Sequence, residues 1–262
     1  MEDFAFCTLT FGEKYLRLSD DLIKDIRSFG AKIFILTNSV EYYRKYNDEN
    51  IVIVPYKGDY FSYNQKKEIV KECLKHFSTA IFLDSAVRIF GLDDLNFLKE
   101  IESGLHIFNV FGSIADSFLN EDICISDGKP RSRNTKYGKE GLDFLIKNNL
   151  KYTRNYHGIG YSEGPLEHFL EGKWIIKKDE GRENVFFDIW DKLSYFVEQK
   201  DLLLGYNNTA GAGEGALMSI SSFNSNIKTH TSRNHLSNIF NTNFISNYQR
   251  KVLGEIPWSM FG

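Results

Sequence analysis

The sequence lacks any long apolar run and has little cysteine. No stretch approaches the roughly 18 consecutive apolar residues that a membrane-spanning helix needs, and residues 1–3 do not begin a basic, then apolar, signal peptide. The three cysteines, Cys7, Cys73 and Cys124, are odd in number and widely spaced, so neither a disulfide framework nor a zinc cluster is indicated. We therefore expect a cytoplasmic protein, either free or peripheral at a membrane, without a transmembrane segment.

The sequence also lacks an excess of charge of one sign. Its 32 Lys and Arg against 35 Asp and Glu give a formal net charge of -3. Such a balance supplies no general field for a polyanion, so nucleic acid is not an expected partner. The 262 residues, 42% of them hydrophobic, contain no repeats and suffice for a sizeable core. We expect a single domain over residues 1–262.

Short apolar runs alternate with segments of helical periodicity through the first half of the chain. Strands are predicted at residues 4–9, 32–36, 51–54, 80–83 and 105–111. Helices are predicted at residues 16–29 and 64–77, the second with Lys66 and Lys67 on its solvent side. The alternation predicts an α/β fold with a mostly parallel sheet flanked by helices.

The second half is less regular. Residues 120–141 are polar and turn-rich and predict a long loop near the site. Helices are predicted at residues 166–170, at residues 185–197 and from residue 216. From residue 221 the chain is rich in Asn and Ser, which favours a tail or a lid that orders over a ligand.

The apolar run at residues 80–83 stops at a carboxylate, Asp84. Ligands of open α/β sheets bind just beyond the carboxyl ends of the strands, so this side chain is expected beside a ligand. A second reading is a turn or cap, because an Asp after a strand often bonds a nearby backbone amide.

Residues 79–90 resemble the strand and Asp-any-Asp motif of nucleotide-sugar glycosyltransferases of the GT-A fold. Asp84 matches the first Asp, whereas Ala86 replaces the second. The layout as far as about residue 111 is similar as well. The resemblance implies a GT-A-like (Rossmann-like) fold, a nucleotide-sugar donor that we expect to be UDP-linked, a glycan or other hydroxyl acceptor, and a divalent cation, Mn²⁺ or Mg²⁺. The replacement by Ala86 leaves the metal requirement open.

By the same resemblance, the loop after the first strand contacts the base of the donor. Thr8, Thr10 and Phe11 are the candidates there. The hydroxyl of Thr10 can bond a base edge, and Phe11 or Tyr15 can stack on the ring. The alternative is that these are ordinary residues of a strand end and a helix start.

Two basic side chains are candidates for the donor diphosphate. Lys67 lies on the helix before the central strand, where similar transferases often place a basic residue, although a solvated helix face also displays lysines. Arg88 stands in an apolar run and needs a partner. That partner is either a phosphate or a carboxylate, Asp84 or Asp93.

The glycine-rich residues 205–215 lead into a predicted helix that carries Glu214 at its start. In the GT-A fold an acid at this place faces the acceptor, so Glu214 and Asp84 are the predicted catalytic residues. The alternative is a first-turn carboxylate favoured by the helix dipole. A C-terminal His completes the metal or diphosphate site in some members, which makes His230 or His235 a candidate, unless these lie exposed in a polar tail.

The sequence therefore predicts a glycosyltransferase in which residues 1–112 bind the nucleotide sugar, residues 113–220 face the acceptor and residues 221–262 form a tail or lid. Whether it inverts or retains stereochemistry stays open. One alternative is a degenerate transferase that binds a nucleotide or sugar without turnover, which Ala86 supports. Another is a sugar nucleotidyltransferase, but residues 8–14 have only one Gly and one Lys where such enzymes have a glycine-rich, basic signature.

Overall fold

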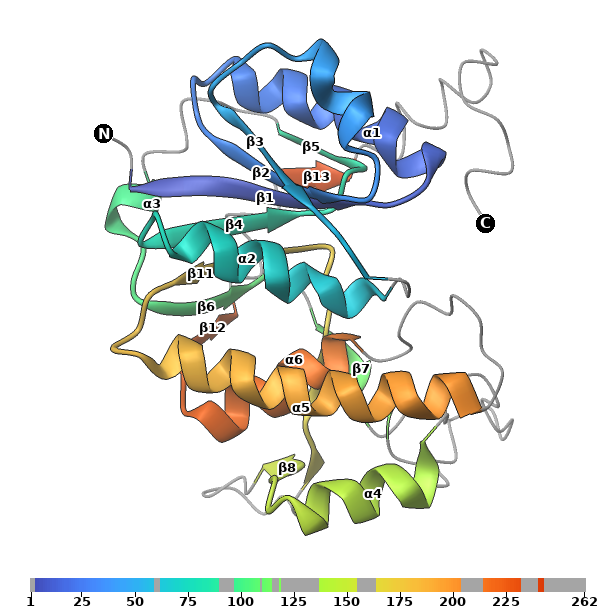
Figure 1. The fold of residues 1–262 in the computed structure, drawn as a ribbon. Coiled ribbons are helices and arrows are strands. Elements are labelled where there is room, and N and C mark those ends of the chain that lie inside the picture. Colours follow the sequence, from blue (N-terminus) through green and yellow to red (C-terminus); the bar gives the residue numbers. More distant parts are fainter. Residues whose placement is uncertain are drawn as a thin grey trace, which may run out of the picture.

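A seven-stranded sheet forms the centre of the fold (Figure 1). The computed structural model describes residues 3–58, 62–89, 97–108, 110–114, 118, 137–154, 164–203, 214–231 and 240–242 of the chain. From edge to edge the strands are β12 (Thr229–Thr231), β6 (Gly104–Ile107), β11 (Lys173–Lys177), β4 (Thr79–Leu83), β1 (Phe4–Thr10), β2 (Ile33–Thr37) and β3 (Ile51–Pro55).

All strands of this sheet run in one direction except β11, which is antiparallel to both of its neighbours, β4 and β6. The chain passes from β1 outward to β2 and β3 and then returns to β4 on the other side of β1. The strand order therefore reverses between β1 and β4, which is the place where open α/β sheets bind ligands. The predicted class, an α/β fold with a mostly parallel sheet flanked by helices, is confirmed.

Helices cover both faces of the sheet (Figure 1). They are α1 (Glu13–Arg27), α2 (Lys66–Leu74), α3 (Phe97–Glu100), α4 (Gly138–Lys147), α5 (Arg182–Leu203) and α6 (Glu214–Ser225), with short 3-10 helices η1 (Val40–Lys45) and η2 (Tyr63–Gln65). Side chains alternate along each strand. In β1, Phe6 packs in the cluster that contains α1, whereas Cys7 packs in the cluster that contains α2, α5 and α6.

Within the described ranges, three short antiparallel pairs lie outside the main sheet. They are β7 (Val110–Ser113) with β10 (Glu167–Phe169), β5 (Val87–Ile89) with β13 (Phe240–Thr242), and β8 (Thr153–Arg154) with β9 (Gly164–Pro165). The predicted helix at residues 166–170 is wrong: five residues are too few for a stable helix, and pairing with β7 decides the conformation. The single strand predicted at residues 105–111 is two strands, β6 and β7.

Two further boundaries differ from the sequence prediction. The C-terminal end of the predicted loop at residues 120–141 already belongs to α4, and the start of the predicted tail at residue 221 falls inside α6, which continues to Ser225. The polar composition after residue 221 predicted a tail, but α6 continues because it packs against the core. Ser221, Ser222 and Ser225 are buried there despite their polarity. The rest of the predicted loop and most of the predicted tail lie outside the described residues.

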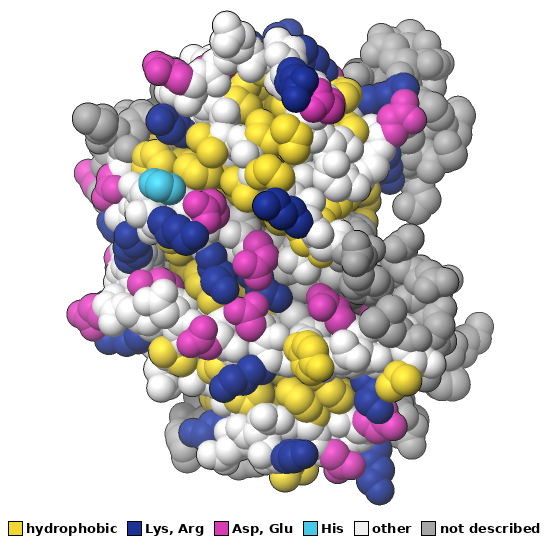
Figure 2. Space-filling model, viewed as in Figure 1, with side chains coloured by type: hydrophobic (Ala, Val, Ile, Leu, Met, Phe, Trp, Pro, Cys, Tyr) yellow, Lys and Arg dark blue, Asp and Glu magenta, His cyan; other side chains and the backbone are white. Residues whose placement is uncertain are grey.

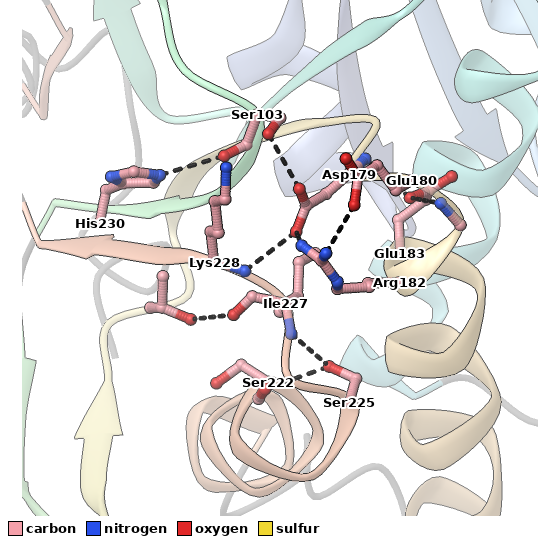
Figure 3. A network of polar contacts seen from close by, with 12 residues as sticks. Ser103, Asp179, Glu180, Arg182, Glu183, Ser222, Ser225, Ile227, Lys228 and His230 are labelled. Atoms are coloured by element: carbon pink, nitrogen blue, oxygen red, sulfur yellow. Dashed lines mark hydrogen bonds and ion pairs between the residues drawn. The ribbon is translucent and has the colours of Figure 1, made fainter.

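A buried carboxylate ties the edge of the sheet to the start of α5 (Figure 3). Asp179, 1% exposed, accepts hydrogen bonds from the hydroxyl of Ser103, the backbone amide of Lys228 and the guanidinium of Arg182. Glu183 in turn accepts a hydrogen bond from the backbone amide of Asp179. The segment entering β12 is therefore held against the segment entering β6.

Figure 2 shows acidic and basic side chains interspersed over the face that carries α2 and α5, with apolar patches between them. On this face no region of a single sign stands out as a surface for a polyanion. Among the described residues, no helix is long and apolar enough to cross a membrane.

Candidate functional site

A pocket of about 280 Å³ opens where the strand order reverses. One side of it is formed by residues at the end of β1 and the other by the turn that follows β4. Its lining residues are Leu9, Phe11, Tyr15, Tyr63, Lys66, Asp84, Ser85, Ala86, Glu171 and Glu214. Five separate segments of the chain thus converge on the carboxyl ends of two neighbouring parallel strands.

Three aromatic rings form one wall. Phe11 follows β1, Tyr15 belongs to the first turn of α1, and Tyr63 begins η2. The rings of Tyr15 and Tyr63 meet edge to face and their hydroxyls are hydrogen-bonded. Phe11 is held by an edge contact with Tyr56, with ring centroids 5.0 Å apart. Such rings offer flat apolar faces to a base or a sugar.

The opposite wall is charged and is organised around Lys66 at the start of α2. Its side chain is 3% exposed, and its Nζ donates to Oε1 of Glu214 at 2.7 Å. The same atom lies 3.3 Å from Oδ1 of Asp84 and 3.4 Å from the backbone carbonyl oxygen of Glu171. Burial lowers the pKa of Lys66, but the neighbouring acids, Asp84 first, outweigh this and raise it, so the ammonium keeps its charge.

The position of Glu214 depends on the glycine that follows it. α6 begins at Glu214, and a Cβ added to Gly215 would lie 1.9 Å from the backbone oxygen of Phe169 and 2.6 Å from the ring of His168. Only a residue without a side chain lets α6 approach β10 this closely. The approach brings the carboxyl of Glu214 to Lys66.

The acids of the pocket differ in the direction of their pKa shifts. Burial raises the pKa of Glu214 well above its ordinary value, against the attraction of Lys66 and with the help of the neighbouring Glu171. For Glu171 burial also acts upward, but Lys66 and the bond from Glu214 outweigh it and the pKa is lowered. The raised pKa of Glu214 favours its neutral form, and the lowered pKa of Glu171 favours its charged form.

Asp84 is partly accessible, with 43% of its side chain exposed, whereas the side chain of Glu214 is 5% exposed. Partial burial raises its pKa, the ammonium of Lys66 opposes this and the charge of Glu171 adds to it, and the net shift is upward. A Cβ at Gly172 would lie 2.9 Å from Oδ2 of Asp84, so this glycine makes room for the carboxylate. Beside it, the buried Oγ of Ser85 has no hydrogen-bond partner among the described residues and is free to bond a ligand.

Three of the predicted site residues, Phe11, Asp84 and Glu214, share this pocket, together with Tyr15. The others lie elsewhere. The hydroxyl of Thr10 accepts a hydrogen bond from Tyr43 in the core on the α1 side, and Thr8 is fully buried in β1; neither lines the pocket.

The two basic candidates are held by other carboxylates. Lys67, which the sequence places on a solvated face, is buried, and its Nζ lies 3.2 Å from Asp191 of α5. Arg88 donates two hydrogen bonds of 2.6 Å to the carboxylate of Asp25 in α1. The expected partners of Arg88, a phosphate, Asp84 or Asp93, are thus replaced by an acid of α1. Asp93 lies outside the described residues.

The predicted metal pair, Asp84 and His230, is not brought together. Two strands, β11 and β6, separate β4 from β12, which at about 4.8 Å per strand makes roughly 14 Å across the sheet. The imidazole of His230 stacks on His106 with centroids 4.4 Å apart, and its Nε2 lies 3.1 Å from the carbonyl oxygen of Ser103. In the part of the chain that the structure describes, no group of three or more His, Cys, Asp or Glu is arranged to hold a metal ion. His235 and residues 205–213 lie outside that part.

Sequence reasoning missed the two charged residues Lys66 and Glu171 of the pocket, and also Leu9, Tyr63 and Ser85. Lys66 was placed on the solvated side of its helix because its partners, 18 and 148 residues further along the chain, leave no local signal. The incorrect prediction of a helix at residues 166–170 drew attention away from Glu171, which directly follows that segment. The dipeptide Glu171-Gly172 directly before the apolar run of β11 is the one signal that indicated a loop with an acid at a strand start.

Comparison with known proteins identifies no family. No family model and no curated protein matches the chain. Among solved structures, the bifunctional glycosyltransferase WbbM in its apo form is 11% identical with a TM-score of 0.42, and the match covers 87% of this chain and 38% of WbbM. The 4-diphosphocytidyl-2C-methyl-D-erythritol synthase of Anaerococcus prevotii DSM 20548 is 10% identical with a TM-score of 0.48, and the match covers 97% and 99% of the two chains. At such distances the likeness assigns no reaction and no family to this chain.

Proposed function

We propose that this protein is a GT-A-like glycosyltransferase that moves a sugar from a nucleotide-sugar donor, UDP-linked by our expectation, to a hydroxyl of a glycan or other acceptor. One observation carries the proposal: the pocket at the strand-order reversal joins an aromatic wall to a cluster of acids around one buried lysine. Aromatic faces suit a base or a sugar ring, carboxylates suit sugar hydroxyls, and an ammonium suits a phosphate. A nucleotide sugar combines all three groups.

In the proposed reaction the acceptor oxygen forms a bond to the anomeric carbon of the donor. The bond from that carbon to the diphosphate oxygen breaks, and its electron pair leaves with the nucleoside diphosphate. The acceptor proton passes to a carboxylate. Glu171 is the better base of its pair, because a base must be ionised, and the pKa of Glu171 is lowered whereas burial raises that of Glu214. Glu214 then accepts the hydrogen bond of Lys66 and keeps the ammonium in place.

The donor would lie with its base against Phe11 and Tyr15 and with Asp84 and Ser85 beside its sugars. Asp84 is the exposed carboxylate at the end of the central strand, and the unpaired hydroxyl of Ser85 adjoins it. The buried free thiols Cys7 and Cys73 fit the cytoplasmic setting that we include in the proposal.

The test is release of nucleoside diphosphate from a panel of UDP-, GDP- and TDP-sugars, with and without candidate acceptors. We expect slow release from one donor by the wild type, and a loss of at least about 100-fold in Glu171→Gln and Asp84→Asn. Glu41→Gln is the matched control, since that acid is 71% exposed and pairs only at the surface with Arg44. Release that is equal in all four proteins contradicts the proposal.

A second candidate is a protein that binds a nucleotide or sugar without turnover. It is favoured by the contacts of Lys66, whose ammonium already has the carboxyl groups of Glu214 and Asp84 as partners. In that case equilibrium dialysis with the same panel detects binding of one ligand, weakened in Asp84→Asn, while no nucleoside diphosphate is released from any donor.

A further inference from the structure

The pocket places a cation among oxygen atoms in the way a metal site does, but the cation belongs to the chain. Nζ of Lys66 lies 2.7 Å, 3.3 Å and 3.4 Å from oxygens of Glu214, Asp84 and Glu171. These oxygens come from three segments: the start of α6, the turn after β4 and the segment before β11. The aromatic faces of Tyr63 and Phe82, with centroids 5.5 Å and 5.4 Å from Nζ, close the remaining sides.

The same oxygens are of the type that a hard divalent cation prefers. Mg²⁺ and Mn²⁺ take carboxylate and carbonyl oxygens. Here the centre of the group is filled by an ammonium whose side chain is 3% exposed, and a doubly charged ion entering beside it would meet like charge at short range. Ala86, which stands where the similar Asp-any-Asp motif has its second acid, lines the pocket and offers no ligand to a metal ion.

We propose that the ammonium of Lys66 occupies the place of a divalent cation, so that the pocket binds no divalent metal and Lys66 itself meets the negative charge of a ligand diphosphate. The first half of this inference concerns metal binding alone; the second half rests on the proposed glycosyltransferase function. The longer of the two carboxylate contacts, 3.3 Å to Asp84, is the one that a phosphate oxygen can replace, while the 2.7 Å bond to Glu214 holds the ammonium in position. Asp84, partly exposed, then turns to the ligand or to water.

The inference is tested by titrating Mn²⁺ into the full chain and measuring free Mn²⁺ by electron paramagnetic resonance, which requires no turnover. We expect the wild type to show no Mn²⁺ binding that depends on Asp84 at Mn²⁺ concentrations up to about 1 mM, the range in which weak sites bind. Removal of the ammonium in Lys66→Ala leaves the oxygens without their cation, and we expect at least a tenfold gain in Mn²⁺ affinity. The double variant Lys66→Ala/Asp84→Asn should lose that gain.

Lys67→Ala is the matched control, because Lys67 is equally buried but pairs with Asp191 outside the pocket. It should leave Mn²⁺ binding unchanged. Stoichiometric binding by the wild type that disappears in Asp84→Asn overturns the inference, and this comparison decides the matter even where Lys66→Ala does not fold. Donor turnover that is unchanged by EDTA supports the role toward diphosphate. If no donor is turned over, the glycosyltransferase proposal is contradicted, whereas the Mn²⁺ titration still tests the inference about metal binding.

Discussion

Replacing Gly215 by Ala tests the packing that carries Glu214 into the pocket. The new Cβ would lie 1.9 Å from the backbone oxygen of Phe169, so α6 and β10 must separate by about 1.5 Å to reach ordinary contact at 3.4 Å. Overpacking against backbone, which has no rotamer to change, costs about 3 kcal/mol. For a chain of this size that corresponds to a fall in Tm of roughly 6–12 °C by calorimetry.

The control is Gly30→Ala. Gly30 has φ +68° and no atom within 4 Å of an added Cβ, so this substitution carries only the backbone strain, about 1 kcal/mol. Its Tm should fall by roughly 2–4 °C and its donor turnover should not change. In Gly215→Ala, a shift of about 1 Å in the carboxyl of Glu214 should reduce turnover about 100-fold. A Tm for Gly215→Ala that is no lower than that of Gly30→Ala refutes the close approach of α6 to β10.

Three further substitutions test charges in and around the site. Because the folded pKa of Glu214 is raised, this group stabilises the fold below about pH 4.5, and its contribution is lost as pH rises. Glu214→Gln should therefore reduce the fall in unfolding free energy between pH 4 and pH 8, measured by urea unfolding. An unchanged dependence of the unfolding free energy on pH counts against a buried acid at this position. Arg88→Lys should cost about 1 kcal/mol of unfolding free energy, because a lysine cannot make both hydrogen bonds to the carboxylate of Asp25 in this partly exposed ion pair. The KM for the donor should not change. A raised KM would indicate that Arg88 contacts the diphosphate after all. Asp179→Asn should cost about 3 kcal/mol, because the buried carboxylate of Figure 3 accepts from three donors; a loss below about 1 kcal/mol in chemical denaturation would show that this network is dispensable.

The parts of the fold that local patterns determine were predictable. β1, β2, β3 and β4 are short apolar runs bounded by polar residues, and α1 repeats its apolar residues at helical spacing, so each was placed within a few residues. β11 was not predicted. Its run Lys173–Lys177 is equally apolar, but its insertion between β4 and β6 in the opposite direction depends on pairing with strands about 70 to 95 residues earlier, which no local pattern encodes.

The candidate site divides in the same way. Asp84 was found because it ends a recognisable strand, and Glu214 because glycines precede a helix start. Lys66 and Lys67 were read as solvated because a helix pattern gives the spacing of charged residues and not their partners, which are Asp84, Glu214 and Asp191. Burial of a charge is a property of the assembled fold.

The central claim is that a nucleotide sugar binds at the reversal of strand order between β1 and β4. The measurement that tests it most directly is amide hydrogen exchange by mass spectrometry of the full chain, with and without the donor selected from the panel, or UDP if none is turned over. The account predicts slowed exchange in residues 11–15, 62–66, 84–87 and 170–172, four of the five segments that meet at the pocket. Exchange that is unchanged in all four segments at saturating ligand, or protection confined to the distant groove beside Lys151 and Ser222, contradicts it.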